Sequence, residues 1–260
     1  MNPSEDYIQQ CRGIVERVAE QGESIREVAG HFAESIMKAR VVHLFGSGHS
    51  RIMVEEMWPR YGSFPGFNPI VELSLTFHNQ VSGANGQRQA MFLENVPGLA
   101  ARILRNFHIS EDDTALVVSS SGCNIVPIEI AEEFQRRGVW VAGLVSLKHC
   151  EGSESKRSDG RKLVDFSDRV LDTGAPLGDS MITIEGLTTP VSPGSTVGGC
   201  MVVNALKAEV ARLLTEAGHP PRVLTSAAIV GKDHAVELFE SAYDEHSRRM
   251  AVLYGEIGRS

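Results

Sequence analysis

Apolar residues recur at intervals of three and four along both ends of the chain, which is the spacing of one face of a helix. The first stripe runs from Ile8 to Ile36 with a gap at Gly22, and the last runs from Val236 to Ile257. We therefore predict one long opening helix that ends near Lys38 and one long closing helix. Because both lie outside the rest of the pattern, we expect them to pack in a dimer rather than only against their own subunit.

Compact apolar runs alternate with helical stretches between these two ends. The alternation predicts a doubly wound sheet of five parallel strands flanked by helices, with ligands bound beyond the carboxyl ends of the strands. The first helical stretch follows the run at 41–45 and continues to Met57. The others cover residues 99–107, 125–136 and about 195–214. The runs are VVHLF at 41–45, NPIVEL at 68–73, TALVVSSS at 114–121, VWVAGLVSL at 139–147 and RVLD at 169–172.

The extent of the domain follows from the same pattern. At 260 residues the chain suits a single domain, with a core over about 40–215 and terminal helices over 1–39 and 233–260. Residues 148–162 contain almost no apolar side chain. We interpret them as an exposed loop or mobile flap rather than a linker between domains.

Composition narrows the classes of function. A net charge of -8 disfavours nucleic acids and anionic membranes as partners, because binding either requires clustered Lys and Arg. The sequence has neither a basic, apolar leader nor an apolar run long enough to cross a membrane, so we expect a cytoplasmic protein. Its four scattered cysteines indicate reduced thiols, and its nine histidines show no metal-binding spacing, so we expect no metal and no cofactor.

The first candidate for chemistry is the loop GSGHS at residues 46–50, which follows an apolar run and opens a helix. Glycines there let backbone amides approach an anion, and the helix dipole favours negative charge. A dinucleotide fingerprint would need Gly or Ala where Arg51 stands, although Glu72 resembles a ribose-binding acid. A tight turn without a ligand is the alternative, and we favour ligand contact.

The second candidate is the loop SSSGCN at residues 119–124, which follows the third apolar run and also opens a helix. Asn124 is placed to cap that helix, and the hydroxyls of Ser119 and Ser121 are placed to bind one phosphate without net positive charge. A serine-rich turn with an ordinary cap would explain this loop if it stood alone. Two such loops after neighbouring strands favour an anion site.

The two loops together resemble the SIS (sugar isomerase) family, in which a Ser-x-Ser-Gly loop holds the phosphate of a sugar phosphate. The resemblance runs from about Arg40 to Leu214 and is strongest to uncharacterised SIS proteins similar to phosphoheptose isomerase. The segments that carry it are GSGHSRIMVEEMWPRYG, LDTGAPLGD, GSTVGGCMVVNAL and PPRVLTSA. It implies phosphate-binding roles for six residues, called here the predicted cradle: Ser50, Ser119, Ser121 and Asn124, with backbone from Gly48 and Ser120.

The catalytic residues of phosphoheptose isomerase do not carry over, because Pro59-Arg60 stands where its glutamate lies and the last core helix has no histidine. An aldose-ketose isomerase needs a base that moves a proton through an enediol. We consider Glu56, one turn earlier, although an i, i+4 ion pair with Arg60 explains it equally well. Glu94 is a second candidate base, and His49 in the first loop is a candidate proton donor.

The leading hypothesis is a sugar-phosphate isomerase that works as a homodimer or homotetramer. One alternative is a lyase or etherase, in which two glutamates remove and add water across a double bond. Another is a sensing module, which would keep the predicted cradle but lack a base. No basic DNA-binding segment accompanies the chain's opening helix, where arginines alternate with acidic residues.

Overall fold

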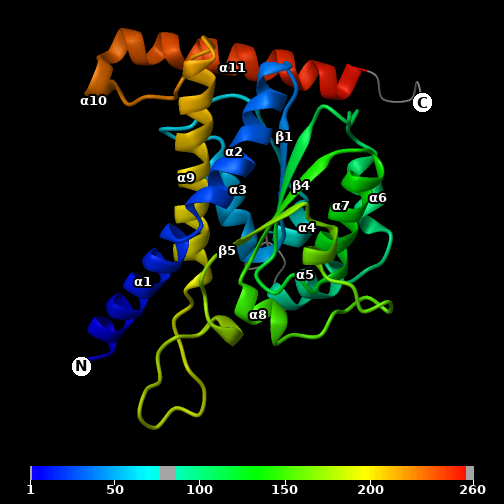
Figure 1. Ribbon diagram of the computed structural model, residues 1–260, viewed down its shortest axis with the longest axis vertical. Coiled ribbons are helices and arrows are strands. Elements are labelled where there is room, and N and C mark those ends of the chain that lie inside the picture. The colour runs from blue at the N-terminus through cyan, green and yellow to red at the C-terminus, as the bar shows by residue number, and fades with distance from the viewer. Residues whose placement is uncertain (1, 77–85, 256–260) are drawn as a thin grey trace.

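The computed structural model describes residues 2–76 and 86–255. Its centre is a sheet of five parallel strands in the order β2-β1-β3-β4-β5 (Figure 1). The predicted doubly wound α/β fold is therefore confirmed. The strands are β1 (Val42–Gly46), β2 (Phe67–Ile70), β3 (Thr114–Val118), β4 (Trp140–Val145) and β5 (Arg169–Asp172).

Helices cover both faces of the sheet. They include α1 (Pro3–Ala19), α2 (Gly22–Met37), α3 (Arg51–Met57), α6 (Leu99–Leu104), α7 (Ile125–Arg136), α9 (Ser195–Glu216) and α11 (Lys232–Gly255). Short elements complete the described chain: η1 (Gly48–Ser50), α4 (Leu73–Thr76), α5 (Gln87–Leu93), α8 (Leu147–Glu151), η3 (Leu163–Phe166), η4 (Leu177–Asp179) and α10 (Ala227–Val230).

Alternate residues of each strand enter two separate hydrophobic clusters. Val42 and Leu44 of β1 pack with α2, α3 and α9, whereas Phe45 packs on the other face with α6 and α7. Because side chains alternate across a strand, a strand covered on both faces must be apolar at nearly every position. The first cluster takes in α2 and part of α11, so the hydrophobic core extends beyond the predicted limits of 40–215.

The opening helix is not continuous, and our prediction of a single helix was wrong at Gly22. The chain turns at Gln21, whose side-chain amide donates to Asp172 O (2.8 Å) and accepts from Asp172 N (2.7 Å). This pair ties the break between α1 and α2 to the end of the edge strand β5. The gap in the apolar stripe marked the break.

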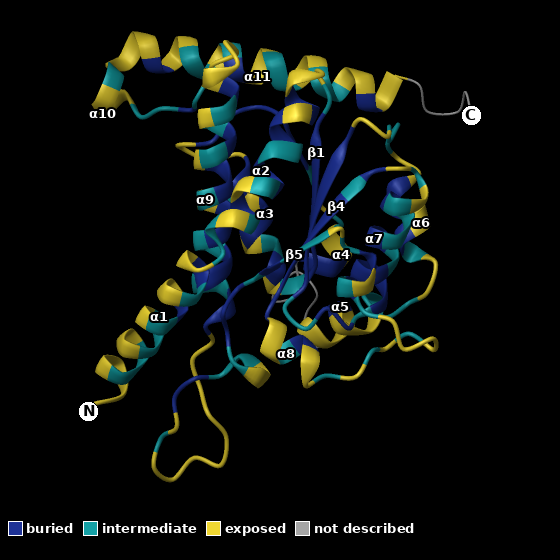
Figure 2. Cartoon of the chain, in the orientation of Figure 1, coloured by how far each residue is buried: buried dark blue, intermediate teal, exposed yellow. Residues whose placement is uncertain are grey.

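Helix α11 crosses the amino end of the sheet (Figure 1). Arg249 donates to the carbonyls of Ile36 (3.1 Å) and Arg40 (2.7 Å), and His108 N donates to Leu253 O (2.8 Å). Much of its outer surface is exposed (Figure 2), and Val236 is among its exposed side chains. Packing of the terminal helices in a dimer stays a prediction.

A buried polar network lies at the same amino end. The Asp113 carboxylate accepts two hydrogen bonds from the Arg40 guanidinium (2.9 and 2.8 Å) and contacts His43 Nε2 at 3.2 Å. The other ring nitrogen of His43 contacts the Asn68 amide at 2.9 Å. Burial raises the pKa of Asp113, but the hydrogen bonds from His43 and Arg40 outweigh it and lower the pKa from 3.8 to about 2.

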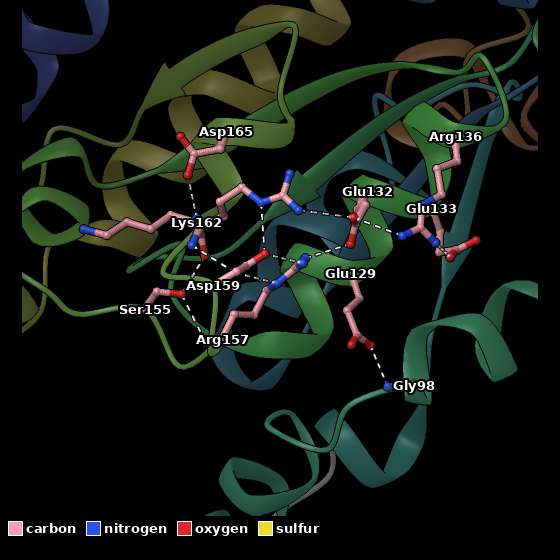
Figure 3. A network of polar contacts seen from close by, with 11 residues as sticks. Gly98, Glu129, Glu132, Glu133, Arg136, Ser155, Arg157, Asp159, Lys162 and Asp165 are labelled. Carbon is pink, nitrogen blue, oxygen red and sulfur yellow. Dashed lines mark hydrogen bonds and ion pairs between the residues drawn. The ribbon is translucent and has the colours of Figure 1, made fainter.

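Residues 148–162 are mostly exposed, but ion pairs hold the segment against α7 (Figure 3). Arg157 bonds Glu132 of α7 at 2.7 Å and Asp159 at 2.8 Å. Arg161 also bonds Asp159, at 2.9 Å. Residues 152–162 are thus a mostly exposed loop, as predicted, with fixed contacts to the helix that follows β3, whereas residues 148–151 belong to α8 and Cys150 is buried.

Candidate functional site

A cavity of about 460 Å³ lies at the carboxyl end of the sheet, between the loops that follow β1 and β3. In the strand order β2-β1-β3-β4-β5, the chain goes from β1 to β2 on one side of the sheet and from β3 to β4 and β5 on the other. The crevice between the carboxyl ends of β1 and β3 is therefore the topological switch point, where ligands of open α/β sheets bind. Both loops singled out from the sequence border this cavity.

The first loop makes a tight turn from β1 into η1 and α3. A Cβ added to Gly46 would lie 2.7 Å from Ser50 O, and Gly48 has a left-handed φ of +55°. This turn buries Ser47 and Ser50 at the cavity wall and leaves His49 exposed at its mouth.

The second loop brings three consecutive serines to the cavity after β3, and Gly122 reverses the chain with a φ of +64°. Asn124 occupies the N-cap position of α7, yet its side chain makes no capping hydrogen bond. Amides at the start of α7 are taken by the preceding segment: Val126 N donates to Glu94 O and Ile125 N to Asn95 Oδ1. An anion would therefore meet loop hydroxyls rather than these helix amides.

Glu94 joins the two loops. It ends α5 and its carboxylate accepts from Ser47 Oγ of the first loop (2.7 Å) and from Asn124 Nδ2 of the second (2.9 Å). The side chain is half-buried and lines the cavity. A carboxylate oriented from both sides is suited to proton transfer at a bound ligand.

Glu56 does not line this cavity. Its carboxylate pairs with Arg60 (2.5 Å) and accepts from Asn204 Nδ2 of α9 (2.8 Å), beside a separate groove of about 630 Å³ between α3 and α11. Burial raises the pKa of Glu56, but the hydrogen bonds from Asn204 and Arg60 outweigh it and lower the pKa. Glu56 therefore forms the i, i+4 ion pair with Arg60 that was the alternative to a catalytic role. Its side chain also contacts α9 rather than the cavity.

His149 also lines the cavity, and the sequence reasoning missed it. It lies in α8, after β4, and its Nδ1 accepts from Gly178 N at 2.7 Å. With Nδ1 occupied as an acceptor, the neutral ring carries its proton on Nε2. The signal was available, because the rule that selected the loops after β1 and β3 applies equally to the loop after β4.

All six residues of the predicted cradle border the same cavity, together with His49 and Glu94. Among the residues that the structure describes, no Lys or Arg lines it, so hydroxyls and amides dominate its surface. Asp179 lines the cavity too, but its oxygens accept from Ser195 N (2.8 Å) and Ser195 Oγ (2.5 Å) at the start of α9. Within the described ranges, no cluster of three or more His, Cys, Asp or Glu is arranged to hold a metal ion.

The model of the SIS domain family matches residues 6–146, more than half of the chain. The fold and the sequence thus define a protein of the SIS domain family, and this chain belongs to it. The match includes most of α1 and all of α2, which lie before the segment in which we saw the resemblance.

Within that family the chain is similar to UPF0309 proteins. One from Geobacillus sp. (strain WCH70) is 31% identical over 254 residues, covering 97% of this chain and 99% of the relative. Another, from Halalkalibacterium halodurans, is 31% identical over 229 residues, covering 88% of this chain and 92% of the relative. The chain is therefore a member of the UPF0309 family, and the predicted family assignment is confirmed.

A solved phosphoheptose isomerase from Francisella tularensis has the same fold. It is 13% identical and superposes with a TM-score of 0.50, covering 82% of this chain and 100% of that one. This similarity extends to the fold alone.

None of the helices within the described ranges is long and apolar enough to traverse a bilayer.

Proposed function

We propose that the cavity binds a phosphosugar and that the protein is an aldose-ketose sugar-phosphate isomerase with Glu94 as its base. The observation that carries the proposal is the Glu94 carboxylate, which is hydrogen-bonded to both loops beside a cavity lined by hydroxyls. The comparison with phosphoheptose isomerase adds a precedent for phosphosugars on this fold.

Phosphate binding is assigned to the predicted cradle. The hydroxyls of Ser50, Ser119 and Ser121 can donate to a phosphate without a cationic side chain, because several hydrogen bonds share its charge. Glu94 repels a phosphate dianion, so the phosphate and the reacting carbons occupy different parts of the cavity. The sugar end is then the part that meets Glu94.

Proton transfer follows from that orientation. Glu94 removes a proton from the carbon next to the carbonyl, and the carbonyl oxygen takes a proton from a donor to form an enediol. The proton held by Glu94 then passes to the former carbonyl carbon, while the other hydroxyl returns its proton to the donor and becomes the new carbonyl. A donor is needed at the oxygen that gains charge. His149 Nε2 suits this role because Gly178 fixes its tautomer, and His49 is the alternative at the cavity mouth.

Ligand binding is tested by thermal shift against pentose, hexose, heptose and amino-sugar phosphates. A phosphosugar at 100 times its Kd stabilises the folded state by about 2.7 kcal/mol. We expect Ser121→Ala to abolish the shift and Ser120→Ala to retain it, since Ser120 is assigned a backbone role only. Absence of any shift at millimolar ligand would contradict phosphosugar binding.

Catalysis is tested by incubating a ligand that binds with enzyme in D2O and following exchange at the carbon beside the carbonyl by NMR. Glu94→Gln should lower the exchange rate by at least about 100-fold while ligand binding persists. Glu56→Gln is the matched control and should exchange at nearly the wild-type rate. Binding without any exchange in the wild-type protein would favour a sensing module over an isomerase.

A further inference from the structure

Asp179 lines the cavity, yet its carboxylate is bonded to the start of α9. Its Oδ1 accepts from Gly194 N (3.0 Å) and Ser195 N (2.8 Å), and its Oδ2 accepts from Ser195 Oγ (2.5 Å). Gly194 is the N-cap residue of α9 and has no side chain that could bond the first amides of the helix. Asp179 therefore supplies the capping oxygens from another part of the chain.

The start of α9 is a fixed point of the fold. A Cβ added to Gly198 would lie 1.7 Å from Thr173 O, so the helix is in backbone contact with the residue that follows β5. Ser195 is buried at the same place. A turn that is joined to this point by three hydrogen bonds has little freedom to move.

The turn held in this way covers residues 176–179, and Asp179 N closes it by donating to Pro176 O (3.1 Å). Two consecutive residues in it have a left-handed backbone, with φ of +77° at Gly178 and +50° at Asp179. A non-glycine residue in this conformation costs of order 1–3 kcal/mol and persists only where its surroundings enforce it. The hydrogen bonds from α9 to the Asp179 carboxylate enforce it here.

The turn directs a backbone donor at His149. Gly178 N donates to His149 Nδ1 at 2.7 Å. The backbone of His149 is fixed as well, because Ser146 Oγ accepts from His149 N (3.3 Å) and donates to Ala175 O (2.7 Å). Donor and ring are thus held from two sides, and the remaining ring nitrogen is Nε2.

We propose that Asp179 is a positioning residue: by holding the left-handed turn against α9, it keeps Gly178 N directed at His149 Nδ1 and so fixes the proton of the neutral ring on Nε2. An imidazole without such a bond exchanges its proton between both nitrogens. With Nδ1 facing Gly178, only a proton on Nε2 can be donated to a ligand. Use of that proton in catalysis rests on the proposed function, whereas the tautomer does not.

The tautomer is tested on the whole chain, labelled with nitrogen-15 histidine, by long-range proton–nitrogen NMR at a pH at which the ring is neutral; His149→Gln assigns the signals. We expect the Nε2–H tautomer in the wild type. Asp179→Gly relaxes the backbone but removes the carboxylate, so the two nitrogen shifts of His149 should move toward each other. An Nδ1–H ring in the wild type, or unchanged shifts in Asp179→Gly, would overturn the proposal.

The conservative variant Asp179→Asn should restore the wild-type shifts. Its Oδ1 still accepts from Gly194 N and Ser195 N, its Nδ2 can donate to Ser195 Oγ, and asparagine tolerates the left-handed conformation. If Asp179→Gly does not fold, Asp179→Ser takes its place with the same two outcomes, because a single short hydroxyl cannot replace both carboxylate oxygens.

Glu129→Ala is the matched control for the loss of a helix cap. The Glu129 carboxylate accepts from Gly98 N (2.8 Å), so it also bonds the amide of a glycine at an N-cap, at α6 instead of α9 (Figure 3). This variant should leave the ring shifts of His149 unchanged. If it moves them as Asp179→Gly does, the effect is a general loosening of the fold and the proposal fails.

The part that Asp179 plays in catalysis is tested with the D2O exchange assay. Asp179→Gly and His149→Gln should each slow exchange at least about tenfold. The double variant should be no slower than His149→Gln, because Asp179 acts through the ring. A further drop in the double variant would show that Asp179 acts on the ligand itself and would overturn the positioning role. If the wild type shows no exchange, the proposed function fails, while the ring shifts still decide the tautomer.

Discussion

The polar groups at the two ends of the sheet differ in their hydrogen-bonding environment. At the amino end, Arg40, His43 and Asp113 are bonded to one another inside the protein. At the carboxyl end, serine hydroxyls line a cavity, and Ser120 Oγ is buried without a hydrogen-bond partner in the described part of the chain. The first arrangement satisfies its polar groups inside the protein, whereas the second leaves the Ser120 hydroxyl unsatisfied and presents the other cradle serines to the cavity.

The largest effect is expected from Asp113→Asn at the amino end. Breaking the buried ion pair leaves the charge of Arg40 without its carboxylate, although its bond to His108 O remains, and should cost about 3–5 kcal/mol of unfolding free energy, measured by urea denaturation. Asp112→Asn is the matched control, because Asp112 forms an exposed pair with Lys38 and should change stability far less. A small loss in Asp113→Asn would show that the network does not stabilise the sheet.

A smaller effect is expected from acid. Because the folded pKa of Asp113 lies below its unfolded value, its contribution is present above pH 3.8 and is lost as pH falls through about 2. The difference amounts to roughly 2.5 kcal/mol. Urea titrations of the wild type between pH 5 and 2 should show this loss, and Asp113→Asn should show a correspondingly shallower pH dependence.

The smallest effect is expected at the carboxyl end. Ser120→Ala removes a buried hydroxyl that has no partner within the described residues, so the ligand-free protein should become more stable by about 0.5–1 kcal/mol. The measurement is the urea midpoint without ligand. A clear destabilisation would mean that this hydroxyl has a partner in the native protein, and the contrast between the two ends would weaken.

The strands could be predicted from sequence because nearly every position of β1, β2, β3 and β4 is buried, whereas the edge strand β5 is only partly buried. The run RVLD coincides with β5 (Arg169–Asp172), and the predicted helix over 125–136 coincides with α7 (Ile125–Arg136). The gap at Gly22 in the apolar stripe marks where the opening helix breaks, but the hydrogen bonds to Asp172 of β5 that fix the turn cannot be seen in local periodicity. Local sequence thus shows where burial is interrupted and does not show which distant residue fixes the turn.

The candidate site could be predicted in part for the same reason. The loops after β1 and β3 can be recognised by their glycines and serines, so the residues of the predicted cradle could be named from the sequence. The choice between Glu56 and Glu94 depends on which way α3 faces and on contacts 30 and 47 residues away from Glu94 along the chain. His149 could have been named by the same rule because it follows β4, but the orientation of its ring depends on Gly178, 29 residues further on.

The hydrogen bonds that Arg249 makes at the amino end of the sheet bear on how the protein is made. Arg249 binds Arg40 O across 209 residues of sequence. At about 5–20 residues per second, the ribosome adds Arg249 roughly 10–40 s after Arg40. During that time the junction between α2 and β1 in the nascent chain lacks its hydrogen bond from Arg249. A chain truncated before α11 never forms this bond.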